Sequence, residues 1–310
     1  MSAPSSAFLQ ATPRAFVLVS SSYVLAAVAA WATLRFAPPT HPLLAIFLAD
    51  VVATIVVFGF SRAFDNSSFY DPYWSVMPIA LAAYLPFSGL PGVVPLNARQ
   101  ALMIAVVGAW AARLTLNWMR GWTGLSHEDW RYVAFRKQFP RAYWLVSFAG
   151  VHFFPTVCTF LGSLAMWPVA TSALPLGPLD FVGAAIALAG TVVEYVADEQ
   201  MRAFRVAQLA AGATSGTCEV GLWGWSRHPN YFGEITFWVG VWVLGITASP
   251  SDAWWTASGP LTMVLLFVFA SIPMMERRSV ARRPEYADVQ RRVSMLVPWP
   301  PRRAEKSSPA

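Results

Sequence analysis

Eight apolar segments, each close to the length of a membrane span, constrain this 310-residue chain more than any other feature. A helix needs about 20 apolar residues to cross the hydrocarbon core, where the backbone finds no partner outside its own helix. The sequence therefore predicts an all-α, polytopic membrane helix bundle with about eight transmembrane helices. Pro155 and Pro168 should kink or split the fifth of them. The segments are residues 15–37, 43–60, 73–89, 101–118, 143–170, 178–198, 231–249 and 253–275.

Composition supports the same fold class. Charged residues make up 12% of the chain and hydrophobic residues 56%, whereas a soluble domain carries about 25% charge. We expect a cytoplasmic tail over 1–14, a single transmembrane domain over 15–303 and a disordered tail over 304–310. The net charge of +6 follows from the placement of basic residues beside the spans, so it does not indicate a nucleic-acid partner.

Lys and Arg residues gather on one side of the predicted membrane. Of the 22, all but Arg35, Arg99 and Arg113 fall at the two termini or in the loops after the second, fourth and sixth segments. Basic residues accumulate on the cytoplasmic side, so we expect both termini in the cytosol. The protein should be an integral, multi-pass protein of a bacterial inner membrane or the endoplasmic reticulum, surrounded by membrane lipids.

Polar side chains recur at the cytoplasmic ends of these segments, often four residues apart and thus on one helix face. Such groups are costly in a membrane, and several together usually mark a site. They predict one polar layer, although ordinary interfacial anchors and ion pairs remain the alternative. We read the isolated Asp50 as a local helix partner. The members of the layer are Asp71, Arg113, Asn117, Glu194, Asp198, Arg202, Asn230, Glu234, Glu276, Arg277 and Arg278.

The chemistry of this layer suits a polyanionic cofactor that arrives from the cytosol. Arg202, Arg227 and the arginines of 277–283 can meet phosphates, and Asn230 with the carboxylates can hold ribose hydroxyls or an amide. No glycine-rich nucleotide loop is present, which argues against a Rossmann module. His127 and His228 have no companions with metal-ligand spacing, so we expect no metal site.

The segment 221–234, GLWGWSRHPNYFGE, resembles the signature of the steroid 5α-reductase C-terminal-domain superfamily. It looks closest to the branch known as domain of unknown function 1295. The tail agrees, with MERR at 275–278, RPEY at 283–286 and RVSMLVPWPPR at 292–302. The resemblance covers about 43–303 and implies a seven-helix reductase-like core, to which the first segment adds one N-terminal helix.

The resemblance implies an NADPH-dependent oxidoreductase that acts on CH–CH groups. It would add a hydride to an activated C=C of a lipid or steroid-like enone held between the helices. Glu194 and Asp198 stand where the family holds its cofactor from the helix before the motif. The full set of candidate cofactor-binding residues is Arg113, Asn117, Glu194, Asp198, Arg202, Arg227, His228, Asn230, Tyr231, Glu234, Glu276 and Arg277.

One departure from the family concerns the substrate. Steroid 5α-reductases place Gln-Glu at the mouth of an early helix to polarise a keto oxygen, and here the corresponding helix begins Tyr70-Asp71. A donor aimed at the oxygen that gains negative charge lowers the barrier. The candidate catalytic donors are protonated Asp71, Tyr70 and Tyr231.

Two other functions stay open. An Arg-His-Pro-Asn-Tyr segment also occurs in S-adenosylmethionine-dependent membrane methyltransferases that modify lipids or prenylcysteine. A lipid-binding or transport protein with a structural polar layer would need no cofactor at all.

Overall fold

The computed structural model of the chain describes residues 13–36, 41–213 and 216–302. The helices group into two compact units, residues 1–175 and 176–310, and each unit is described by itself. The predicted tail 304–310 lies outside the described residues, as does all but the last two residues of the predicted tail 1–14. The single domain predicted over 15–303 stays a prediction.

Unit 1 is a bundle in which α1 packs on α2, α3 packs on α4, and α7 contacts both α2 and α3. Its elements are α1 (Pro13–Phe36), α2 (Pro42–Ala63), η2 (Ser67–Tyr70), α3 (Tyr73–Tyr84), η3 (Leu85–Phe87), α4 (Ala98–Gly121), α5 (Trp130–Gln138), α6 (Tyr143–Val146), η4 (Ser147–Phe153), α7 (Phe154–Ser163) and α8 (Met166–Thr171).

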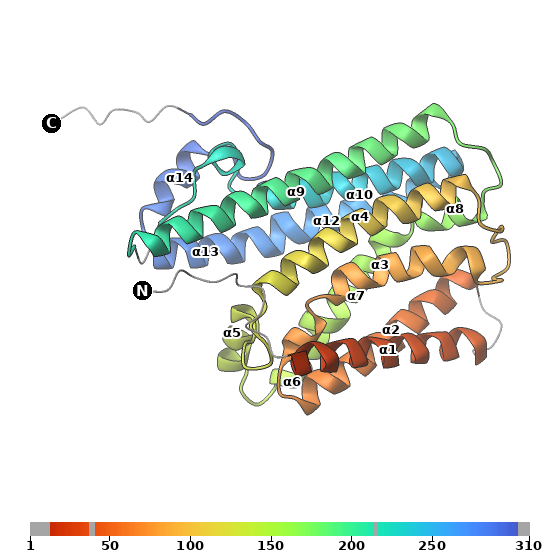
Figure 1. Cartoon of the computed structure of the whole chain (residues 1–310), viewed down its shortest axis with the longest axis horizontal. Coiled ribbons are helices and arrows are strands. Elements are labelled where there is room, and N and C mark those ends of the chain that lie inside the picture. The colour runs from red at the N-terminus through yellow and green to blue at the C-terminus, as the bar shows by residue number, and fades with distance from the viewer. Residues whose placement is uncertain (1–12, 37–40, 214–215, 303–310) are drawn as a thin grey trace. The chain divides into compact units, whose positions relative to one another are not determined.

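Unit 2 is built on the pair α9 and α10, and α12 packs against α10. Its elements are α9 (Pro178–Ala210), η5 (Gly221–Gly224), α10 (Pro229–Ala248), η6 (Pro250–Asp252), α11 (Ala253–Thr256), α12 (Ser258–Leu265), η7 (Leu266–Ser271), α13 (Ile272–Arg282) and α14 (Tyr286–Arg292). Helices make up both units (Figure 1), and in the described residues the one isolated β-bridge pairs Ser226 with Ser294.

Seven helices of the described chain are long and apolar enough to cross a membrane, which confirms an all-α, multi-pass membrane protein. The remaining predicted segment, 73–89, is the shorter α3, which has 12 residues and continues into η3. Together α3 and η3 run from one end of unit 1 to the other (Figure 1). At the first end, the segment before α3 is hydrogen-bonded to Leu125, and at the second end, the loop after η3 is hydrogen-bonded to Ala170. The backbone just before α3 is buried in protein, where a short helix is tolerated.

Prolines interrupt the fifth predicted segment as expected. A π-helical turn, η4, ends just before Phe154-Pro155, and two turn residues separate α7 from α8, which contains Pro168. A proline has no N–H and its ring clashes with the preceding turn, so the helix widens there. The same device recurs in unit 2, where the π-helical η7 precedes Ile272-Pro273.

Glycines set the spacing between α9 and α10. A Cβ added to Gly190 would lie 2.5 Å from both Gly233 O and Phe237 N, and a Cβ on Gly183 would lie 3.0 Å from Leu244 N. Gly240 stands equally close to Ala187 of α9. Small residues at such positions let two helix backbones approach in a membrane, where no hydrophobic force draws helices together.

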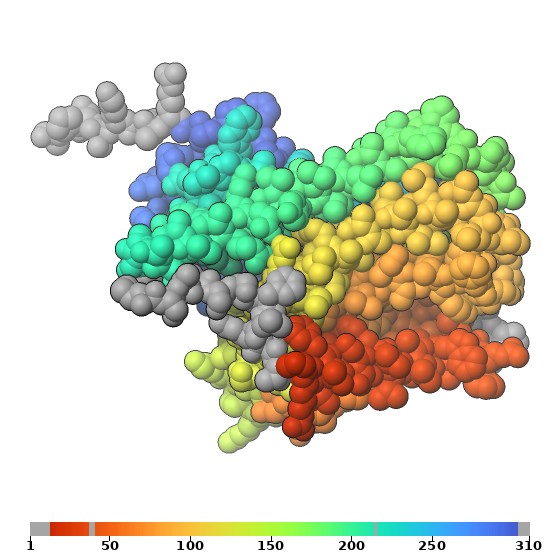
Figure 2. Space-filling model, in the orientation of Figure 1, coloured from red at the N-terminus to blue at the C-terminus, as the bar shows by residue number. Residues whose placement is uncertain are grey.

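Helix α9 continues well past its predicted end at residue 198. It has 33 residues, about 50 Å at 1.5 Å per residue, against a hydrocarbon core of about 30 Å. It runs along the surface of unit 2 (Figure 2), and its exposed apolar side chains include Phe181, Val192 and Tyr195. The last three turns carry Arg202 and Arg205, which suits a helix end that projects from the membrane.

Candidate functional site

A single carboxylate, Glu276 of α13, joins three elements of unit 2. Its Oε1 accepts hydrogen bonds from Arg227 Nε at 2.6 Å and His228 Nε2 at 3.1 Å. Its Oε2 accepts from Gln290 Nε2 of α14 at 2.7 Å. Three of the predicted cofactor-binding residues, Arg227, His228 and Glu276, are thus in direct contact, and Gln290 is a partner that the sequence did not indicate.

The Arg227 guanidinium is hydrogen-bonded to other groups of the protein. Besides its ion pair with Glu276, it donates from Nη1 to Gln290 O at 2.7 Å and to Val293 O at 2.8 Å. These carbonyls belong to the C-terminal end of α14, where an arginine can satisfy backbone acceptors that the helix leaves open. Arg227 therefore holds α14 in place, and its role as a phosphate ligand stays a prediction.

Hydrogen bonds hold the C-terminal segment against the residues at the start of α10. Ser226 Oγ donates to Leu296 O at 2.7 Å and accepts from His228 N at 3.1 Å. Further along, Trp299 N donates to Trp225 O at 3.0 Å. The two sequence segments that carry the family resemblance, 221–234 and 275–302, are therefore bonded to each other.

Acceptor groups gather where α9 meets the first turn of α10. Glu194 is 2% exposed and packs against the Gly233 backbone, and Glu234 is 5% exposed. Glu234 accepts a hydrogen bond from Trp238 Nε1 at 2.9 Å. Asn230 Oδ1 is buried, and no hydrogen-bond donor within the described chain reaches it. A buried polar atom without a partner calls for an explanation, and a ligand donor is one.

The remaining candidates of unit 2 flank this face. The Tyr231 ring is stacked between His228, at 5.4 Å between centroids, and Phe267, at 4.5 Å. Arg202 lies 3.5 Å from Glu199 one turn earlier, and Asp198 is partly buried on the same helix. Arg277 is exposed in the middle of α13.

Four predicted residues belong to unit 1: Tyr70, Asp71, Arg113 and Asn117. Tyr70 Oη lies 2.5 Å from Thr156 Oγ1, and burial raises the pKa of Tyr70. Arg113 and Asn117 lie four residues apart on α4. The predicted single layer combined groups from both units, so as a whole it stays a prediction.

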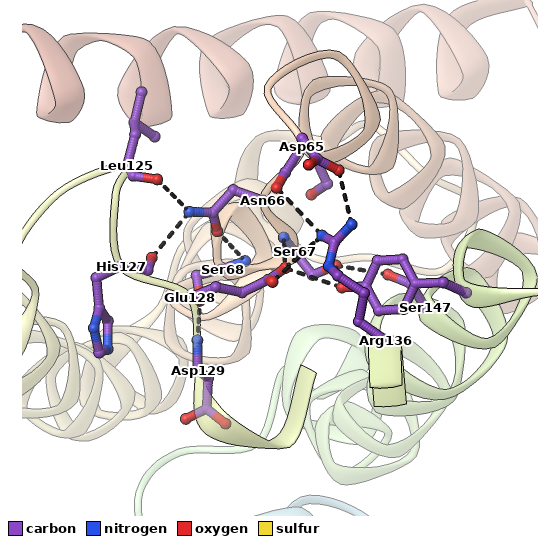
Figure 3. Close-up of polar contacts among 12 residues, drawn as sticks. Asp65, Asn66, Ser67, Ser68, Leu125, His127, Glu128, Asp129, Arg136 and Ser147 are labelled. Carbon is purple, nitrogen blue, oxygen red and sulfur yellow. Dashed lines mark hydrogen bonds and ion pairs between the residues drawn. The ribbon is translucent and has the colours of Figure 1, made fainter. Parts of the chain in front are cut away.

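A dense hydrogen-bond cluster fixes the turn that carries Tyr70 and Asp71 (Figure 3). Asn66 Nδ2 donates to Leu125 O at 2.8 Å and His127 O at 2.9 Å, while Asn66 Oδ1 accepts from Ser68 N. Glu128 Oε1 accepts from Ser67 N, Tyr143 and Arg136. The groups of this cluster satisfy one another, so we assign it a structural role.

Asp71 sits at the edge of that cluster. Its Oδ1 accepts a hydrogen bond from Tyr132 Oη of α5 at 2.7 Å. Burial is the largest influence on the carboxyl and raises its pKa to about 6, although the bond from Tyr132 acts in the opposite direction. The carboxyl therefore exchanges its proton close to neutral pH.

Asp71 should make stability depend on pH. The folded chain keeps the proton between the ordinary pKa of 3.8 and about 6, so stability falls as pH rises through that window. We expect the free energy of unfolding to drop by up to about 3 kcal/mol, since one pKa unit corresponds to about 1.4 kcal/mol. Thermal unfolding in detergent at several pH values checks this. Asp71→Asn should reduce the slope by this contribution, and an unchanged slope in that variant would contradict the assignment.

The sequence placed Asp50 outside the site as a local helix partner. In the structure its carboxyl instead accepts a 2.6 Å hydrogen bond from Tyr73 Oη of the next helix. An ionisable residue in an apolar span was the available signal, but nothing in the sequence identified Tyr73 as its partner.

No three metal-ligating side chains of the His, Cys, Asp and Glu types come together anywhere in residues 13–36, 41–213 and 216–302. The candidate site therefore consists of hydrogen-bonding and charged groups.

Comparison with known proteins agrees with the resemblance seen in the sequence. Residues 57–293 match the family described as "Protein of unknown function (DUF1295)". A protein of Schizosaccharomyces pombe, described as "Uncharacterized protein C594.04c", is 28% identical over 282 residues, which covers 84% of this chain and 80% of the relative. No solved structure matches the chain. The matched range contains every predicted site residue of both units.

Proposed function

The chain belongs to the DUF1295 family, and we propose that it is a membrane-embedded reductase that uses NADPH to reduce an activated C=C of a lipid or steroid-like enone. The cofactor, when bound, supplies the hydride. The protein's own residues would bind and orient both molecules and keep water away.

The observation that carries the proposal is the unpartnered Oδ1 of Asn230 beside two buried carboxyl groups. Ribose hydroxyls and a carboxamide are hydrogen-bond donors, so they suit the acceptors Asn230 and Glu194, with Asp198 one turn further along α9. Of the arginines first assigned to phosphates, Arg202 and Arg277 keep that role in the proposal, because Arg227 is committed to Glu276 and α14.

On the substrate side, Asp71 is the best of the three proposed donors. Its Oδ1 accepts from Tyr132, so a proton on Oδ2 can be donated to a carbonyl oxygen. Tyr70 gives its own proton to Thr156, whose hydroxyl must donate to His152 O. Tyr231 is held in a ring stack, which fixes the position of its hydroxyl.

A methyltransferase that uses S-adenosylmethionine is the second candidate, and the state of Arg227 favours it. A cofactor without phosphates does not need the cation that the structure commits elsewhere. Under either proposal the site end of unit 2, which carries basic residues, would face the cytosol.

Cofactor binding to detergent-purified protein tests the proposal. We expect NADPH to bind more tightly than S-adenosylmethionine, and Asn230→Ala to weaken NADPH binding about ten- to a hundredfold, as for one lost hydrogen bond in a desolvated site. Glu234→Ala is a poorer probe, because it also removes the acceptor of the hydrogen bond that the indole N–H of Trp238 donates.

Thr236→Ala is the matched control, since the Thr236 hydroxyl donates to Phe232 O of its own helix. It should bind NADPH like the wild type. Tighter binding of S-adenosylmethionine would move the protein to the methyltransferase class. Binding of neither cofactor would favour a non-catalytic lipid-binding or transport protein.

A further inference from the structure

Three large apolar side chains of unit 2 are exposed on the two segments that meet just before α10. Trp225, Val297 and Trp299 are 51%, 56% and 70% exposed. Trp299 N donates to Trp225 O at 3.0 Å. In the same contact, Ser226 Oγ donates to Leu296 O at 2.7 Å. The three exposed side chains therefore come from adjoining segments, and we call them the tryptophan patch.

Bonds to α9 fix the level of this patch along the membrane-crossing helices. Trp223 Nε1 donates to Ala197 O at 2.8 Å, whereas Thr247 Oγ1, near the other end of α10, donates to Asp180 Oδ1 at 2.6 Å. From Asp180 to Ala197 helix α9 rises about 26 Å at 1.5 Å per residue, and the hydrocarbon core is about 30 Å thick. The turn before α10, which carries Trp225, therefore lies at the edge of the hydrocarbon core.

The chemistry of the patch suits the lipid headgroup layer. A tryptophan ring is mostly apolar, yet its indole N–H can bond to headgroup oxygens, and tryptophan is enriched at membrane–water interfaces for this reason. Residues 294–302 contain Arg302 but no acidic side chain, so the segment does not repel lipid phosphates. An apolar surface without negative charge at this depth is complementary to phospholipid.

We propose that the tryptophan patch inserts into the headgroup layer and binds phospholipid, with the indole N–H groups toward phosphate and glycerol oxygens and Val297 toward the first carbons of the acyl chains. The patch anchors segment 294–302 to the membrane, although this segment follows the last span in sequence. Since Ser226 is bonded to the same segment, the anchor also holds the residue next to Arg227. It requires neither cofactor nor substrate, so it does not depend on the proposed function.

Fluorescence quenching of the full chain in lipid nanodiscs tests the anchor. An NBD fluorophore is attached to Val297→Cys, and labelled wild-type protein gives the background, because Cys158 and Cys218 are buried. Phosphatidylcholine with a nitroxide on its headgroup should quench this probe strongly, and aqueous iodide should quench it weakly. The matched control is Glu285→Cys, an exposed position at the end of α14 opposite the one bonded to Arg227. Its ratio of lipid to iodide quenching should be several-fold lower.

Two results with the Val297→Cys probe would overturn the anchor. Iodide quenching as strong as in the Glu285→Cys control would place the patch in water, and protection from both quenchers would mean that protein, such as a second copy of the chain, covers it. Replacing both tryptophans, by Trp225→Ser and Trp299→Ser, should lower lipid quenching of the probe and raise iodide quenching. Unchanged quenching would show that the tryptophans do not hold the segment. If that variant does not fold, the Val297→Cys result alone decides.

Discussion

Replacing Gly190 with alanine should destabilise the protein by about 3 kcal/mol or more, although alanine is the better helix former. The new Cβ would stand 2.5 Å from Gly233 O and from Phe237 N, both backbone atoms of α10. Backbone atoms of a helix cannot move as a flexible side chain does, so α9 and α10 would have to separate. Overpacking of this kind costs typically 1–3 kcal/mol, and more where nothing can give.

The matched control is Gly59→Ala in α2, where a Cβ meets nothing within 4 Å. There the gain in helix propensity, about 1 kcal/mol, should leave the protein equally or more stable. The measurement is the thermal unfolding midpoint of both variants in one detergent. Equal midpoints for the two variants would show that α9 and α10 do not rely on their glycines.

Loss of the Glu276 carboxylate should cost about 3–5 kcal/mol in the free energy of unfolding. Arg227 and Glu276 are only 10% and 12% exposed at their side chains, and Glu276→Ala leaves a buried guanidinium without its counterion. Removing one partner of a buried pair is strongly destabilising for that reason. His228 and Gln290 would lose their common acceptor as well.

A double-mutant cycle separates the ion pair from the rest of the cluster. Arg227→Met should be destabilising by itself, because the carbonyls of Gln290 and Val293 lose their donor. Combined with Glu276→Met, it should cost clearly less than the sum of the two single changes. Additive costs in chemical unfolding would mean that the two groups do not stabilise each other. In that case Arg227 would be available to a ligand after all.

The sequence predicted the helices well because lipid restricts the backbone so strongly. An apolar run of about 20 residues in a membrane has few alternatives to a helix, and the observed ends of α2 and α10 differ from prediction by three residues or fewer. Prolines predicted where the fifth segment is interrupted. The predicted end of α9, at residue 198, falls 12 residues short of the observed end. The last turns of the helix contain charged and polar residues, so they carry no membrane signal.

The sequence by itself determined that this is a helical membrane protein and that polar residues collect near helix ends in the segments 221–234 and 275–302. Only the tertiary structure decided what those residues do. From its sequence position, Arg227 could bind a phosphate or a carboxylate equally well. In the structure it is bonded to the Glu276 carboxylate and to the end of α14. Asp50 found its partner in Tyr73, 23 residues away. Helix formation follows from local composition and solvent, whereas the partner of a polar group depends on which helices pack together, and that is set by contacts distant in sequence.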